Sequence, residues 1–263
     1  MKLAVDHIIQ VVDDLQQVSR TLDSLDLQTV VHVDDRRAAT VLHQCKNTYV
    51  EYCTPFTVLS NCCIPHFDSR GDDSYRPRTW IALGVDDIHS CAQLLRNEEY
   101  IVEGPIRQRL QLPTGDVVES VVLIPKLRSR SDIPLPIFME RVPSGVHALS
   151  VVPEQTRSVV SPDVSLRLRN IAIATHDVST VVETWASMLG RRPTECWIQA
   201  DIASYCVRIP LDDDVHIIFC SPVGEGIVAD ALREHGDQVF LLNFTGSADQ
   251  VDRSICGTVY RLM

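Results

Sequence analysis

Three side chains that can ligate a metal ion lie in runs of sequence that favour β-strands. His7 lies in the run LAVDHIIQVV, Glu51 in TYVEY and Glu140 in LPIFMERV. A neutral imidazole with one or two carboxylates suits first-row divalent cations such as Mn²⁺, Fe²⁺, Ni²⁺, Co²⁺ or Zn²⁺. A cation held by so few protein ligands keeps open positions, where it can polarise a substrate oxygen. A lone histidine on an apolar strand is more often a core residue than a metal ligand. The predicted elements around His7 are therefore needed to choose between these two interpretations.

The first 54 residues predict a strand, a helix and then three strands. Residues 3–12 are short and rich in β-branched side chains, which favours a strand. Asp13 and Asp14 follow, and aspartates favour a helix N-terminus. Apolar residues then recur at helical spacing, at Leu15, Val18, Leu22 and Leu25. Residues 27–33, 39–45 and 48–54 are three further strand-like runs, so the order is β-α-β-β-β.

The same order of elements returns later in the chain. A second copy begins with the strand-like run TWIALGV at residues 79–85, again followed by two aspartates, and a third begins at Leu168. The ending VEYCTPF of the first copy matches HIIFCSPV in the third, and such an internal echo indicates a repeat. After a predicted helix at 227–234, a strand at 239–245, a helix at 247–255 and a strand at 258–262 make only half of a fourth copy.

These repeats predict an α+β fold of tandem βαβββ modules that form cup-shaped mixed sheets, with an incomplete fourth module. We expect residues 1–145 to form one domain of two modules and residues 167–263 a second, incomplete domain. Residues 146–166 are expected to link them, because proline and serine punctuate this stretch. The segment 56–77 is a long connection, and connections of this length in compact domains are often functional.

Composition excludes several classes of partner. The formal net charge is −11, which disfavours nucleic acid and anionic lipid surfaces. No run of 18 apolar residues occurs, so no membrane-spanning helix is expected. The nine cysteines follow no metal-binding spacing, which favours reduced thiols in a cytoplasmic protein. These features do not exclude a small-molecule ligand or a second protein chain as a partner.

The repeated unit resembles the vicinal oxygen chelate superfamily, and residues 1–145 resemble its glyoxalase-like branch. The Asp-His pair in VDHIIQVVDDL, the strand TYVEY and the strand LPIFMERV carry the resemblance. In such families two modules curl into one cup, and the metal ligands come from the first and last strands of each module. The resemblance thus implies ligand positions at His7, Glu51, Trp80 and Glu140. Trp80 cannot ligate, and an alignment on Pro143 places Met139 in the position of Glu140.

The site implied by the resemblance is therefore a divalent metal ion held by His7, Glu51 and Glu140, with Glu140 also serving as a catalytic carboxylate. Substrate-binding positions are expected from the remaining side chains of the cup: Trp80, His43 and Tyr52. The third module has Asn170 and Ile218 where the first has His7 and Glu51. The second cup is consequently expected to lack the ligands.

Three functions remain open. The first is a metal-dependent lyase, isomerase or dioxygenase that acts on a small oxygenated molecule. The second is a metal-free protein that binds or sequesters an apolar small molecule, which Trp80 in a ligand position favours. The third is an interaction protein whose incomplete module is completed by a partner. An open sheet edge favours pairing with another chain, and residues such as Phe240 and Leu242 would be uncovered. A homodimer is therefore expected, unless residues 143–165 or the helix at 227–234 cover the gap.

Overall fold

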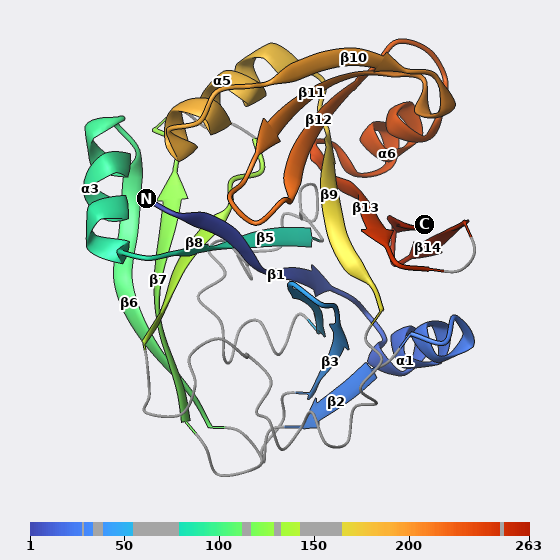
Figure 1. The fold of residues 1–263 in the computed structure, drawn as a ribbon, viewed down its shortest axis with the longest axis horizontal. Coiled ribbons are helices and arrows are strands. Elements are labelled where there is room, and N and C mark those ends of the chain that lie inside the picture. Colours follow the sequence, from blue (N-terminus) through green and yellow to red (C-terminus); the bar gives the residue numbers. More distant parts are fainter. Residues whose placement is uncertain are drawn as a thin grey trace.

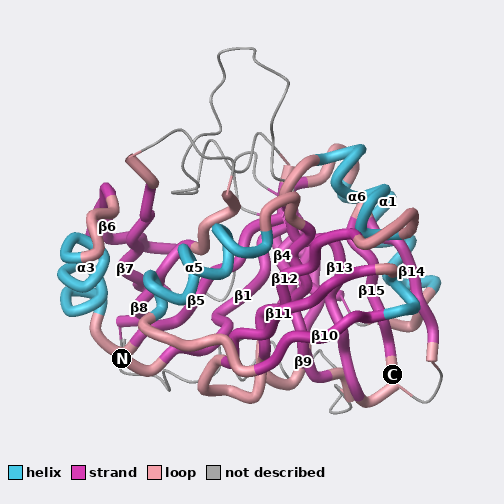
Figure 2. The backbone as a smooth tube through the Cα atoms, turned by 90° about the horizontal axis from the view of Figure 1, so that it is seen from above, coloured by secondary structure: helices cyan, strands magenta, loops and turns pink. Residues whose placement is uncertain are grey.

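The computed structural model describes residues 1–27, 29–33, 39–54, 79–111, 117–128, 133–142, 165–247 and 250–263. These residues form two mixed sheets with helices beside them (Figure 1 and Figure 2). The segment 56–77 and most of the predicted linker 146–166 lie outside the described residues. No helix in the part of the chain that the structure describes combines the length and apolar character needed to cross a membrane.

The first sheet has eight strands in the order β2-β3-β4-β1-β5-β8-β7-β6. It consists of two βαβββ modules, whose first strands are antiparallel neighbours at the centre of the sheet. The first module contains β1 (Leu3–Val11), α1 (Leu15–Ser24), β2 (Thr29–Val33), β3 (Ala39–Gln44) and β4 (Tyr49–Cys53). The second contains β5 (Thr79–Val85), α3 (Ile88–Asn97), β6 (Ile101–Gln111), β7 (Val117–Lys126) and β8 (Ile137–Val142).

The second sheet repeats this arrangement with seven strands in the order β10-β11-β12-β9-β13-β15-β14. The third module contains β9 (Arg167–Ala174), α5 (Val178–Leu189), β10 (Glu195–Gln199), β11 (Ser204–Pro210) and β12 (His216–Pro222), with a short 3-10 helix at Ala200–Ile202. It is followed by α6 (Ile227–His235), β13 (Gln238–Thr245), β14 (Val251–Ile255) and β15 (Thr258–Leu262). Tandem βαβββ modules with an incomplete fourth copy are thus confirmed.

An aspartate starts the helix of each complete module. Asp14, Asp87 and Asp177 are the N-cap residues of α1, α3 and α5, and each side chain accepts hydrogen bonds from backbone N–H groups of the first turn. These bonds satisfy donors that a helix start otherwise leaves unpaired. Gly190 ends α5 in the left-handed conformation, with φ of 61°. The starts of these three helices could therefore be predicted from the sequence.

The helix predicted at 247–255 is wrong, because residues 251–255 form the strand β14. Ile255 pairs with Thr258 of β15, and the two residues between them, Cys256 and Gly257, have positive φ values of 50° and 83°. Two-residue turns of this kind match the twist of an antiparallel pair. The apolar residues Val251 and Ile255 are four apart, a spacing that lies on one face of a helix and of a strand alike.

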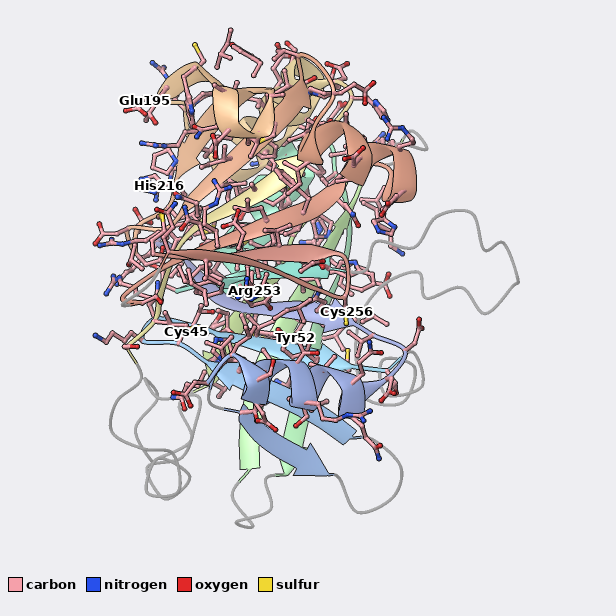
Figure 3. All side chains as sticks on the ribbon, turned by 90° about the vertical axis from the view of Figure 1, so that its right-hand side faces the viewer. Cys45, Tyr52, Glu195, His216, Arg253 and Cys256 are labelled. Carbon is pink, nitrogen blue, oxygen red and sulfur yellow. The ribbon has the colours of Figure 1, made fainter. Side chains whose placement is uncertain are left out.

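We call the face of each sheet that packs against the helices α1, α3 and α5 its outer face. The outer faces of the two sheets share one hydrophobic core. Ile8 and Leu83 of the first sheet belong to the same cluster of buried residues as Ile171 and Leu242 of the second. Helices α1, α3 and α5 contribute side chains to the same cluster. In Figure 3, Tyr52 lies where the N-terminal strands meet the C-terminal ones. The two halves of the chain are therefore packed into one body.

Helix α6 covers the other, inner face of the second sheet. Its residues Val228 and Leu232 are buried against Phe240 of β13 and Ile218 of β12. The expectation that Phe240 and Leu242 would be uncovered is wrong, because they are 1% and 0% exposed. Phe240 lies under α6 and Leu242 lies in the shared core. Cover within the same chain therefore removes the apolar surface that the predicted homodimer was to bury.

Candidate functional site

The inner face of the first sheet is the face that carries His7, Ile9 and Val11 of β1. Figure 1 shows that the strands on both flanks, β2 and β3 on one side and β7 and β6 on the other, extend toward the same side of β1 and β5, so the sheet curls. An apolar cluster lines this face, formed by Ile9, Val11, Cys53, Val122, Ile124 and Ile137 with Trp80, Ile106 and Met139 packed against them. His7 therefore lies beside an apolar surface.

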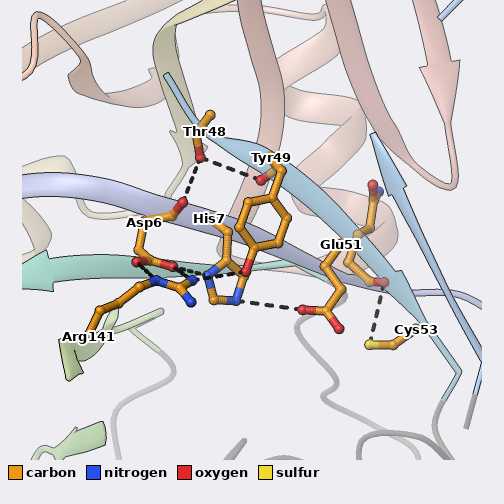
Figure 4. A network of polar contacts seen from close by, with 8 residues as sticks. Asp6, His7, Thr48, Tyr49, Glu51, Cys53 and Arg141 are labelled. Atoms are coloured by element: carbon orange, nitrogen blue, oxygen red, sulfur yellow. Dashed lines mark hydrogen bonds and ion pairs between the residues drawn. The ribbon is translucent and has the colours of Figure 1, made fainter. Parts of the chain in front are cut away.

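A β-bulge in β1 brings two neighbouring polar side chains together. Val5 pairs with Leu83 of β5 and His7 pairs with the next residue, Ala82, so Asp6 is an extra residue in the ladder. In a regular strand Asp6 and His7 would point to opposite faces. A bulge changes this alternation locally and redirects a side chain. As a result, the Oδ1 atom of Asp6 lies 2.6 Å from Nδ1 of His7 (Figure 4).

The other ring nitrogen of His7 faces Glu51. The Nε2 atom lies 3.7 Å from Oε2 of Glu51, which comes from the parallel neighbour β4. The ring of Tyr49, also on β4, stacks on the imidazole with 4.8 Å between ring centroids and an angle of 4° between planes. The His7 side chain is 5% exposed and that of Glu51 is 22% exposed. The imidazole is therefore held between two carboxylates, and the Glu51 end is the more open.

Arg141 of β8 completes the network. Its Nε donates to Oδ2 of Asp6 at 2.8 Å and its Nη2 donates to Oδ1 at 2.6 Å, with a further bond of 3.2 Å to the Tyr49 hydroxyl. Burial alone would raise the pKa of the Asp6 carboxyl, but the hydrogen bonds and charges of His7 and Arg141 hold that pKa well below its ordinary value. Asp6 is thus a carboxylate whose charge Arg141 balances.

This arrangement can provide two donor atoms to one cation. A carboxylate only accepts hydrogen bonds, so the short contact with Asp6 places a proton on Nδ1 and leaves the lone pair of Nε2 available in neutral His7. Two ligands at about 2.0–2.2 Å from a tetrahedral metal ion lie about 3.4 Å apart. The 3.7 Å between Nε2 and the Glu51 carboxylate is close to that separation. The residues present therefore fit a divalent cation as two of its ligands.

Known proteins resemble this chain in structure. No protein-family model and no curated protein sequence matches it. A hypothetical protein from Staphylococcus aureus matches with a TM-score of 0.71 at 15% identity, over 99% of both chains. A variant of 4-hydroxymandelate synthase from Streptomyces coelicolor, a member of the vicinal oxygen chelate superfamily, matches with a TM-score of 0.53 at 12% identity, over 93% of this chain and 70% of that chain. The chain has the vicinal oxygen chelate fold.

Within the vicinal oxygen chelate fold, the structure brings His7 and Glu51 together but not Glu140. Strand alternation turns Glu140 to the outer face, where its carboxylate accepts a 2.8 Å hydrogen bond from the backbone N–H of Ile88 at the start of α3. Met139 faces the inner apolar cluster instead. The three residues of the expected ligand set, including Glu140 with its expected catalytic role, therefore do not converge on one point. Among the described residues, no group of three or more His, Cys, Asp or Glu side chains is placed to hold a metal ion.

Two of the three expected substrate-binding residues also face away from the site. Tyr52 is fully buried in the shared core, and the His43 ring meets Phe244 of β13 edge-on at 6.2 Å between ring centroids. Trp80 does lie on the inner face, against the apolar cluster. Because side chains alternate along a strand, Glu51 on the inner face already requires Tyr52 on the outer one. That signal was available in the sequence.

Asp6, Tyr49 and Arg141 were not predicted as site residues. Tyr49 and Arg141 share strand parity with Glu51 and Met139, so alternation alone would have found them. Strand alternation could not have predicted Asp6, because only the bulge turns its side chain toward His7. In the second half of the fold, Asn170 and Ile218 occupy the positions of His7 and Glu51, and Ile218 packs under α6. The inner face of the second sheet is thus apolar packing at that point.

Proposed function

We propose that the first sheet binds a divalent metal ion through His7 and Glu51, and that the protein uses it as a lyase, isomerase or dioxygenase on a small oxygenated molecule. The observation that carries this proposal is the contact of 3.7 Å between Nε2 of His7 and Oε2 of Glu51. Nδ1 of the same ring is held by Asp6. Histidines that ligate metals in proteins almost always donate their other N–H group in this way.

The charges around the site also support a cation. Arg141 balances Asp6 through two hydrogen bonds, so the carboxylate of Glu51 adds a further negative charge beside the imidazole. The nearby apolar cluster lowers the local dielectric constant and so strengthens the attraction between a cation and Glu51. A cation at this place meets both donor atoms without displacing the Arg141–Asp6 pair.

Each residue then has a separate role. When bound, a divalent cation would supply a positive charge that polarises a substrate oxygen. His7 and Glu51 hold the cation, Asp6 orients the imidazole, and Tyr49 packs on its face. The apolar side chains of the inner face, with Trp80 among them, bind the carbon skeleton of the substrate and exclude water.

Calorimetric titration of protein that has been stripped of metal with a chelator and then dialysed tests this proposal. Mn²⁺, Fe²⁺, Co²⁺, Ni²⁺ and Zn²⁺ are titrated one at a time, and we expect at least one of them to bind with a stoichiometry of one. His7→Ala and Glu51→Gln should each abolish this binding. Glu140→Gln is the matched control, because it removes the same charge on the opposite face of the sheet. Absence of binding by the wild-type protein, or an equal loss in Glu140→Gln, contradicts the proposal.

A second function is favoured by the side chains in the other two ligand positions of the fold. Trp80 and Met139 are both apolar and both pack on the inner cluster, as in a protein that binds an apolar molecule without a metal ion. Quenching of Trp80 fluorescence by an apolar ligand in the presence of chelator would detect such binding, with Trp80→Phe as the control. Binding that survives chelator and His7→Ala favours this second function over the first.

A further inference from the structure

We infer that Asp6 is a positioning residue that fixes the tautomer and orientation of His7, and that Arg141 in turn fixes Asp6. The inference rests on the proposed function in one respect, because it concerns how His7 is prepared to ligate. The geometry itself is a chain of contacts from Arg141 through Asp6 and His7 to Glu51, as Figure 4 shows.

The first step is the bulge. Without the extra residue in β1, the side chain of Asp6 would lie on the face opposite His7. The register shift between Val5 and His7 brings Oδ1 of Asp6 to 2.6 Å from Nδ1. The Asp6 side chain is only 9% exposed, so water does not compete freely for its oxygen atoms. Bulges are common beside active sites, where they redirect a side chain.

The second step is the immobilisation of the carboxylate. Arg141 donates to both oxygen atoms of Asp6, which stops the carboxylate from rotating away from His7. The same guanidinium group donates to the hydroxyl of Tyr49, whose ring is stacked on the imidazole. Tyr49 therefore restrains His7 from one face while Asp6 restrains it at Nδ1.

The third step follows from proton positions. Nδ1 carries a proton because the carboxylate of Asp6 can only accept. In neutral His7 the lone pair of Nε2 then points toward the carboxylate of Glu51, across 3.7 Å. That separation is too long for a hydrogen bond. Two acceptors that face each other repel unless a cation lies between them, so the tautomer set by Asp6 prepares this pair for a cation.

Nitrogen NMR of the imidazole ring tests the tautomer without any metal. Long-range ¹⁵N–¹H correlation spectra of the metal-free wild-type protein should show Nδ1 protonated and Nε2 unprotonated. In Asp6→Ala the proton should move to Nε2, where it can be donated to Glu51. Asp87→Ala removes an aspartate of comparable hydrogen bonding at the start of α3 and should leave the His7 spectrum unchanged. A wild-type His7 protonated at Nε2 alone would overturn the inference.

Metal titration supplies a second readout. Loss of a hydrogen-bonding partner of a metal-bound histidine typically lowers metal affinity 10–100-fold, and we expect a loss of this size in Asp6→Ala. Because that variant leaves Arg141 unpaired, a double variant, Asp6→Leu with Arg141→Leu, removes both charges together. Replacement of a whole buried ion pair by apolar residues is often tolerated. Wild-type affinity in a folded Asp6→Ala or in the double variant would overturn the positioning role.

The two experiments separate this inference from the proposed function. If the wild-type protein shows Nδ1 protonated and binds no cation, the proposed function fails and the positioning of His7 stands. If the wild-type protein and Asp6→Ala bind a cation equally well, the metal site stands and the positioning role fails.

Discussion

The hydroxyl groups of Tyr52 and Tyr260 are hydrogen-bonded to each other in the core between the two sheets. Tyr52 belongs to β4 of the first module and Tyr260 to β15 of the last, and both are 0% exposed. Residues 208 positions apart thus satisfy each other's buried polar groups. Burial is the main cause that raises the pKa of each hydroxyl well above its ordinary value of 10.0.

These raised pKa values predict an alkaline limit to stability. The neutral hydroxyls are favoured in the folded state, so their contribution is complete below pH 10 and is lost as the pH rises from 10 toward the folded pKa values. Above pH 10 each tyrosine should cost up to about 1.4 kcal/mol per pH unit in the free energy of unfolding. Urea unfolding between pH 9 and 11 measures the slope. The double variant Tyr52→Phe with Tyr260→Phe should show a shallower loss, and an unchanged slope contradicts the prediction.

Loss of a buried residue of α6 should destabilise the protein strongly. Leu232 is 5% exposed and packs on the inner face of the second sheet. Leu232→Ala should lower the free energy of unfolding by about 2–5 kcal/mol, because it removes apolar contacts and leaves a cavity. Arg233→Ala on the exposed side of the same helix is the control, with an expected change within about 0.5 kcal/mol. Equal midpoints of urea unfolding for both variants would show that the packing of α6 on the second sheet contributes little to stability.

The turn between β14 and β15 gives a test of backbone strain. Gly257 has φ of +83°, and a Cβ atom added there would lie 3.2 Å from Nε2 of His235. Gly257→Ala should lower the free energy of unfolding by about 1–2 kcal/mol, because the left-handed region is unfavourable for residues with a Cβ atom. Gly224→Ala is the control, since nothing lies within 4 Å of its added Cβ atom. Thermal unfolding that is the same for both variants would contradict the assignment of the turn.

If His7 and Glu51 bind a cation as proposed, a third ligand on the inner face should strengthen that binding. Met139 faces that side, next to Gly84 in the ladder, whereas Glu140 faces α3. Met139→Glu would place a carboxylate on the same face as His7 and Glu51, the residues of the proposed site. We expect at least about a tenfold gain in affinity for a divalent cation, or about 1.4 kcal/mol, by calorimetry. If a folded Met139→Glu variant shows no gain in affinity, any cation bound by the protein does not lie within reach of residue 139 on β8.

The predicted homodimer now depends on a sheet edge alone. With Phe240 and Leu242 buried, the edge strand of the incomplete module is β14, whose residues Asp252, Arg253 and Ser254 are exposed. Charged residues on an edge strand disfavour pairing with another chain. Light scattering at micromolar concentration measures the mass directly. A value near the 29.5 kDa of one chain would contradict the dimer.

The modules could be predicted from the sequence because each depends on local signals that repeat. Aspartate caps, helical apolar spacing and β-branched runs recur in the same order, so the first three modules followed from them. The position of α6 could not be predicted in this way. Its apolar residues Val228 and Leu232 indicate a buried face, but they do not indicate which sheet face lies against it.

For the candidate site, the sequence indicated residues on regular strands but not the residue at the bulge. His7 and Glu51 were expected together from the family resemblance, and the structure places them on the neighbouring strands β1 and β4. Tyr52 and Glu140 were misplaced although strand alternation opposes both positions. The role of Asp6 depends on one irregular residue in the ladder, and the sequence carries no local signal for a bulge there.

The core shared by the two sheets makes the chain one cooperative unit. The Gln10 side chain donates to the Ile255 carbonyl and the Thr258 hydroxyl, while Asn47 exchanges two hydrogen bonds with the backbone of Leu168. We therefore expect the two sheets to unfold together, so that heating gives a single calorimetric transition, and two separate transitions would contradict this expectation. A ligand that binds only the folded state raises the melting temperature of everything coupled to it. If the proposed site at His7 binds a cation, its occupancy should therefore slow hydrogen exchange in β15, although that strand belongs to the other sheet.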